Sequence, residues 1–199
     1  VLFLIGFLVA DSYKILVYSP AFGHSHSNYL GRMADILVEA GHDVTTLVSV
    51  MDPECGDGTK LSNVIKLQAS EETARLHSLI TQTKADMFSM NPFNPIGAYF
   101  MGKFFSTIFA TQCRALLDEP GLVEELKAEK FDVFFTENFD MCGVGLTELI
   151  KPRSLIPVSS CSAFGPQLEE FGIPATLSYD PALYVSKMNV HSMWDRIVN

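Results

Sequence analysis

The segment "KILVYSPAFGHSHSNYLGRMADILVEAGHDVTTLVSV", residues 14–50, decides the fold because it encodes a strand, a helix and another strand in succession. Residues 14–20 form a short apolar run that predicts the first strand. Apolar residues then recur at helical spacing and form one core-facing stripe: Leu30, Met33, Ala34, Leu37 and Val38. Gly41 stands where a left-handed residue ends such a helix, and residues 42–50, rich in Val and Thr, predict the second strand. This order favours parallel pairing of the two strands.

The rest of the chain alternates in the same way and predicts an α/β fold with a doubly wound, mostly parallel, Rossmann-like sheet. Further strands are expected at residues 62–68, 131–137 and 154–160. Helices are expected at residues 70–80, 97–113, 118–130 and 143–150, and the residues from Ala163 onward read as Pro-rich loop. In such sheets ligands bind outside the carboxyl ends of the strands.

Composition excludes one class of partner. The chain has 199 residues, of which 48% are hydrophobic, so it can bury a sizeable core. Its formal net charge is −9, and no Lys/Arg cluster offsets that charge, so nucleic-acid binding is not expected.

The first residues are typical of a secretory signal peptide. Residues 1–10 are apolar and uncharged, and small residues follow at a plausible cleavage point, which predicts a signal peptide over residues 1–12 without its basic start. A buried first strand is the alternative, but a second apolar strand follows at once. The mature chain is expected to begin near Asp11 or Tyr13.

The four cysteines give a weaker signal. Cys55, Cys113, Cys142 and Cys161 form no C-x-x-C pair, which disfavours a zinc ribbon or a thioredoxin-type motif. In an oxidising compartment they have three possible pairings, and we expect free, mostly buried thiols.

Two histidines stand between the first strand and the helix, in "YSPAFGHSHSNYLG", residues 18–31. A dinucleotide-binding turn needs three glycines, and this turn has only Gly23. A nucleophile elbow needs a final glycine where Ser27 stands. A metal site lacks a third ligand at typical spacing, so no metal is expected. Hydrogen bonding of the two histidines within a loop remains open.

A general base is the remaining interpretation. The apolar stripe places the helix start close to Ser27, with His26 in the first turn and His24 further out in the loop. The positive end of the helix dipole disfavours an imidazolium there, so such a His can accept a proton. It then needs a carboxylate to orient the ring, and Glu137, at the end of a later strand, is the candidate.

These residues resemble a known family. Residues 18–45, with "GHSHSNYLG" and "GHDVT", together with "FDVFFTENFDMCG" at 131–143, resemble the UDP-glycosyltransferase family, especially its animal UDP-glucuronosyltransferase branch. The resemblance covers nearly the whole chain. It implies that His26 is the catalytic base and that Glu137 is the catalytic partner that orients it. The family usually has Asp at the position of Glu137, so Asp140 is a fallback acid.

The resemblance also implies the wider setting. Residues 13–199 would be the N-terminal, acceptor-binding domain of a GT-B fold, without the C-terminal UDP-sugar domain and the membrane anchor. The full-length protein would transfer glucuronic acid or glucose from the co-substrate UDP-glucuronic acid or UDP-glucose to a small lipophilic acceptor, with inversion and without a cofactor. It would reside in the endoplasmic reticulum lumen, anchored to the membrane, while this chain alone would be inactive.

An acceptor site is expected around four residues, namely Phe22, His24, Tyr99 and Phe104. The aromatic segment that contains Tyr99 and Phe104 is equally typical of plain helix core, and a membrane-surface role is a further option. A different class of function is a non-catalytic α/β domain that binds small ligands without turning them over. Binding of a UDP-sugar by the full-length protein would distinguish the transferase from the non-catalytic domain.

Overall fold

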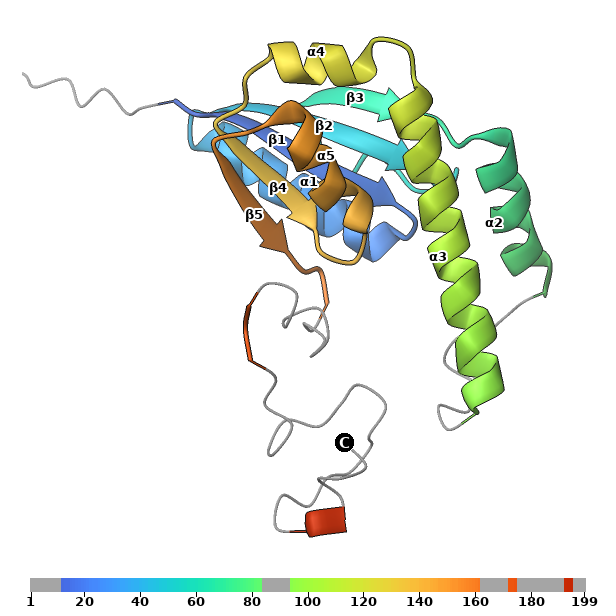
Figure 1. The fold of residues 1–199 in the computed structure, drawn as a ribbon. Coiled ribbons are helices and arrows are strands. Elements are labelled where there is room, and N and C mark those ends of the chain that lie inside the picture. Colours follow the sequence, from blue (N-terminus) through green and yellow to red (C-terminus); the bar gives the residue numbers. More distant parts are fainter. Residues whose placement is uncertain (1–11, 84–93, 162–171, 175–191, 195–199) are drawn as a thin grey trace, which may run out of the picture. The chain divides into compact units, whose positions relative to one another are not determined.

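The computed structural model describes residues 12–83, 94–161, 172–174 and 192–194. The chain divides into two units, one formed by Val1–Leu79 and Ile108–Ser160, the other by Ile80–Thr107 and Cys161–Asn199. The first unit contains the whole sheet (Figure 1). The predicted signal peptide lies outside the described residues except for its last residue, and so does most of the predicted Pro-rich loop.

In the described part of the chain, one sheet has five strands in the order β3-β2-β1-β4-β5 (Figure 1). Every neighbouring pair is parallel. The strands are β1 (Lys14–Ala21), β2 (Asp43–Val50), β3 (Asn63–Leu67), β4 (Val133–Glu137) and β5 (Ser154–Val158). The predicted doubly wound α/β fold is confirmed. The strand order reverses between β1 and β4, which is where ligands bind in such sheets.

Alternating residues of β1 face the two layers of helices. Leu16 and Tyr18 are buried with residues of α3, α4 and α5, whereas Ile15 and Val17 are buried with residues of α1. Both faces of the central strand are therefore apolar, as expected for a parallel sheet covered on both sides. The helices are α1 (His24–Glu39), α2 (Glu71–Thr83), α3 (Pro95–Asp118), α4 (Leu122–Ala128) and α5 (Met141–Ile150).

Helix α1 packs through the predicted stripe but begins earlier than predicted. Leu30 and Ala34 are fully buried, and Gly41 has the left-handed φ of 92° expected just past the helix end. The helix starts at His24 with Gly23 as its N-cap, so the expectation that His24 lies in the loop is wrong. The physical reason is that the first turn contributes no apolar residue to the stripe, so the stripe cannot mark the helix start.

The loop after β2 packs tightly on α1. A Cβ on Gly31 would lie 2.0 Å from the carbonyl carbon of Gly58, so only glycine permits this approach. Asp35 is buried and accepts hydrogen bonds from the Thr59 hydroxyl and from the next two backbone N–H groups. Burial raises the pKa of Asp35, but these hydrogen bonds outweigh burial and hold it below its usual value. These contacts hold the loop against α1.

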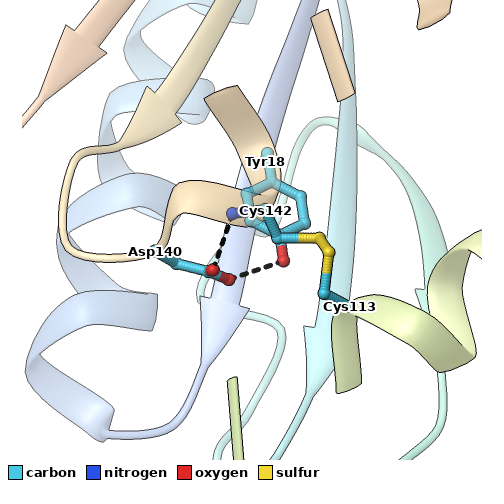
Figure 2. The surroundings of a disulfide bond; sticks show 4 residues. All are labelled: Tyr18, Cys113, Asp140 and Cys142. Carbon is cyan, nitrogen blue, oxygen red and sulfur yellow. Dashed lines mark hydrogen bonds between the residues drawn. A yellow bond between two sulfur atoms is a disulfide. The ribbon is translucent and has the colours of Figure 1, made fainter. Parts of the chain in front are cut away.

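A disulfide corrects the expectation of four free thiols. Cys113 of α3 and Cys142 of α5 are joined, with their Cα atoms 5.6 Å apart (Figure 2). The two residues are separated by 29 positions, and only the packing of α3 beside α5 brings them together. Cys55 agrees with the expectation, because it is a free and buried thiol. Burial raises the pKa of this thiol to about 11.

Removing this disulfide is expected to destabilise the protein by about 3–4 kcal/mol, because the bond restricts a loop of roughly thirty residues in the unfolded chain. The double variant C113S/C142S should unfold at lower temperature than wild type, measured by circular dichroism. C161S, a change at an exposed cysteine, is the control and should stay within about 0.5 kcal/mol of wild type. If a reducing agent leaves the wild-type midpoint unchanged, the disulfide does not contribute to stability.

Candidate active site

Three neighbouring strands deliver polar groups to the carboxyl edge of the sheet. Strand β1 leads into the first turn of α1, which carries His26. Strand β4 ends at Glu137, and Ser160 follows the end of β5. Strands β1, β4 and β5 lie side by side in parallel (Figure 1). The three residues therefore meet at one place. The structure thus brings together His26 and Glu137, the two residues predicted from the sequence as a pair.

The contact between the pair involves one ring nitrogen. His26 Nδ1 lies 3.3 Å from Glu137 Oε2, and the Glu137 side chain is fully buried while that of His26 is 15% exposed. The other carboxylate oxygen, Oε1, accepts a hydrogen bond from the backbone N–H of Ser160. Because Nδ1 faces the carboxylate, Nε2 is the nitrogen that can exchange a proton with a bound molecule.

The first turn of α1 places the two histidines differently. The backbone N–H of His26 bonds the carbonyl of the N-cap, Gly23, and no acidic residue stands in this turn. No carboxylate of this turn therefore neutralises the positive end of the helix dipole. His24 has an exposed side chain at the first helical position, so its predicted role in acceptor binding stays a prediction.

Aromatic rings form an apolar wall beside His26. The ring of Phe22 lies 4.2 Å from the imidazole, centroid to centroid, and 4.9 Å from the ring of Phe109. Phe139 stacks on Phe22 at 5.4 Å and lies 5.8 Å from His26. Phe22 was predicted from the sequence as a residue of the site, whereas Phe139 was not. Its position two residues after Glu137, at the end of a strand, is the signal that could have found it.

The other two predicted acceptor residues lie in the second unit. Tyr99 is 62% exposed and its ring contacts that of Phe100. Phe104 is partly buried, with its ring edge against Phe105. Their part in acceptor binding stays a prediction.

The fallback acid, Asp140, forms its hydrogen bonds with Tyr18 and Cys142. Its Oδ2 accepts a hydrogen bond of 2.8 Å from the Tyr18 hydroxyl, and its Oδ1 accepts from the backbone N–H of Cys142 (Figure 2). Asp140 is thus the N-cap of α5. Burial raises the pKa of Asp140, and burial together with the Asp140 charge raises the pKa of Tyr18 well above its usual value. This carboxylate stabilises α5 and β1, and Glu137 is the acid beside His26.

Two features are absent from the part of the chain that the structure describes. No group of three or more His, Cys, Asp or Glu side chains in that part of the chain is arranged to hold a metal ion. Among the helices that the structure describes, none combines the length and the apolar character that crossing a membrane requires.

Ser160 is the polar residue of the site that sequence reasoning missed. Its hydroxyl contacts His26 Nδ1, and its N–H contacts Glu137. A serine shortly after a strand is too common to stand out in a sequence. Its position at the carboxyl end of a predicted parallel strand is the sequence signal that could have found it.

The chain is similar to known proteins over nearly its whole length. The family model described as "UDP-glucoronosyl and UDP-glucosyl transferase" matches residues 13–199. Human UDP-glucuronosyltransferase 3A1 is 31% identical over 200 residues, which cover 98% of this chain and 36% of that protein. Putative UDP-glucuronosyltransferase ugt-47 of Caenorhabditis elegans is 29% identical over 181 residues, covering 89% of this chain and 33% of that protein.

Solved structures give a more distant match. The structure of TcCGT1 in complex with UDP has a TM-score of 0.45 and 10% identity, covering 90% of this chain and 36% of that one. The chain spans about a third of the length of the curated relatives it matches. The match of the family model over nearly the whole chain shows that this chain belongs to the UDP-glucuronosyl and UDP-glucosyl transferase family.

Proposed function

We propose that the full-length protein transfers a sugar from a UDP-sugar to the hydroxyl group of a small lipophilic acceptor, with His26 as the general base. The observation that carries the proposal is the contact between His26 Nδ1 and the buried carboxylate of Glu137. A carboxylate at this nitrogen favours the tautomer in which Nε2 is the proton acceptor.

The proposed reaction is a single displacement. His26 Nε2 takes the proton from the acceptor hydroxyl as its oxygen bonds to the anomeric carbon of the sugar. The bond from that carbon to the UDP oxygen breaks, UDP leaves with the bonding electrons, and the configuration at the anomeric carbon inverts. The Glu137 carboxylate, 3.3 Å from Nδ1, stabilises the imidazolium that forms. No metal or cofactor takes part in this proposal.

The aromatic wall supports a lipophilic acceptor. Phe22, Phe109 and Phe139 place apolar rings beside the proposed base. A phenol or an apolar alcohol suits such a surface, since apolar lining with few polar groups is typical of small-molecule sites. His24, on the first turn of α1, is proposed as a further acceptor contact.

The sugar donor is proposed to bind outside this chain. The chain spans about a third of its relatives, so we assign residues 13–199 to the N-terminal, acceptor-binding domain of a GT-B fold. UDP-glucuronic acid is the first donor to test, because the names of the relatives specify glucuronosyl transfer. UDP-glucose is the second, since the family includes glucosyl transferases.

A secretory location is proposed, with the full-length protein anchored at the endoplasmic reticulum membrane and its site in the lumen. The disulfide between Cys113 and Cys142 supports this location, because disulfides persist in oxidising compartments. The apolar residues 1–10, typical of a signal peptide, agree.

The full-length protein is expected to form β-linked conjugates when incubated with either UDP-sugar and a panel of phenols, detected by mass spectrometry and NMR. The 199-residue chain alone is expected to form none with the same substrates. Conjugates made by the chain alone would overturn the assignment of donor binding to another domain. Acceptor binding by the full-length protein without any UDP-sugar binding would favour the alternative, a non-catalytic ligand-binding domain.

A further inference from the structure

Ser160 touches both members of the proposed catalytic pair. Its backbone N–H donates to Glu137 Oε1 at 3.3 Å, and its hydroxyl lies within hydrogen-bond distance of His26 Nδ1. The carboxylate is thus held through one oxygen by Ser160, while its other oxygen faces the imidazole. These contacts form a closed ring of three residues from three neighbouring strand ends.

The backbone around Ser160 is fixed by the sheet. Glu137 pairs with Val158 at the end of β4 and β5, and the N–H of Asn138 donates to the carbonyl of Val158 at 2.8 Å. Ser160 follows two residues later, so its position is set by the same strand pair that positions Glu137. The hydroxyl therefore reaches His26 from a position two residues beyond the paired ends of β4 and β5.

The carboxylate in this ring of contacts selects one tautomer of His26. An ionised carboxylate only accepts hydrogen bonds, whereas a serine hydroxyl both donates and accepts. If Nδ1 carries the proton, its N–H has two acceptors, Glu137 Oε2 and Ser160 Oγ. If Nδ1 carries no proton, its lone pair faces the carboxylate, which is unfavourable. The carboxylate therefore favours the protonated Nδ1, whereas the hydroxyl can bond Nδ1 in either tautomer and holds the ring in place.

From this arrangement we infer that Ser160 is a positioning residue: its hydroxyl holds the ring of His26 against Glu137, whose carboxylate keeps the proton on Nδ1 and leaves Nε2 to accept the proton. The inference rests on the proposed function of His26. Ser160 takes no part in bond making, and its effect reaches the acceptor only through the imidazole.

Substitution by alanine isolates the hydroxyl, because S160A keeps the backbone N–H that donates to Glu137. In the full-length protein S160A is expected to lower kcat about twofold to tenfold, the loss of one hydrogen bond to a neutral group. KM for donor and acceptor should stay within about twofold. S160T restores a hydroxyl and should recover most of the turnover. S154A removes an exposed hydroxyl at the far end of β5 and should match wild type.

A second measurement does not depend on activity. The imidazole nitrogens of the full-length protein, labelled with [15N]histidine, report the tautomer of His26 by NMR, with His26→Gln identifying its signals. Wild type and S160T should show the Nδ1–H tautomer, and S160A should show an increased share of the Nε2–H tautomer. Unchanged kcat and unchanged tautomer in S160A would overturn the inference.

Other results distinguish a failure of the positioning role of Ser160 from a failure of the proposed function. A rise in KM without a fall in kcat in S160A would show that Ser160 contacts a substrate and would also overturn the positioning role. A wild-type protein that turns over no member of the panel would contradict the proposed function. In that case a tautomer that still depends on the Ser160 hydroxyl would support the positioning role by itself.

Discussion

His26→Ala in the full-length protein is expected to lower turnover by about 10²–10⁴-fold, the usual contribution of a general base. The affinity for the UDP-sugar should change little, because we assign donor contacts mostly to another domain. The effect is expected to be large because, among the hydrogen bonds that the structure describes, His26 provides the imidazole in contact with the buried Glu137 carboxylate and no second imidazole does so. Initial rates at saturating donor measure the loss.

Two variants sharpen this test. His24→Ala, two residues away on the same turn, removes an exposed imidazole and should alter acceptor affinity more than turnover. Glu137→Gln keeps the shape of the side chain but removes its charge, so it should slow turnover by less than His26→Ala. Asp140 cannot replace Glu137 while it caps α5 and binds Tyr18. An inactive His24→Ala beside an active His26→Ala would show that the wrong histidine is assigned as the base.

Gly143→Ala is expected to destabilise the protein by about 2–3 kcal/mol through overpacking of the core. A Cβ on Gly143 would lie 1.9 Å from Thr136 Oγ1 and 2.7 Å from Tyr18 Cδ1. Both neighbours are fully buried, and the Tyr18 hydroxyl is bonded to Asp140, so neither side chain can move away easily. The added methyl group must push α5 away from β1 and β4.

Gly145→Ala is the matched control, since it lies in the same helix with nothing within 4 Å of an added Cβ. Alanine forms helix more readily than glycine, so this change should stabilise by about 0.5–1 kcal/mol. Thermal unfolding followed by circular dichroism should therefore shift in opposite directions for the two variants. Equal midpoints for both would mean that α5 does not approach the sheet as closely as the structure shows.

The fold was predictable from local patterns. The apolar stripe of α1, the glycine after it and the flanking apolar runs are set by residues close together in the chain. Their periodicity reflects the side-chain repeat of a helix and a strand, which needs no knowledge of distant contacts. The topology rule for parallel strands then placed the site at their carboxyl ends. The start of α1 was missed because His24 and its neighbours pack no apolar side chain into the core.

The pairing of His26 with Glu137 was predictable only as a hypothesis. Both stand at strand ends, so the topology brings them to one edge, but whether they touch depends on β1 and β4 being adjacent. That adjacency is decided by the packing of the whole sheet. The structure shows the contact at 3.3 Å.

Sequence alone thus determined the order and type of the elements, the parallel sheet and the edge at which the site lies, because these follow from short-range periodicity. Tertiary structure alone decided which groups meet there. Ser160, Phe139 and the disulfide partner of Cys113 are unremarkable residues in the sequence. They acquire their roles because strands and helices far apart in the chain pack within a few ångströms, and no local pattern encodes that distance.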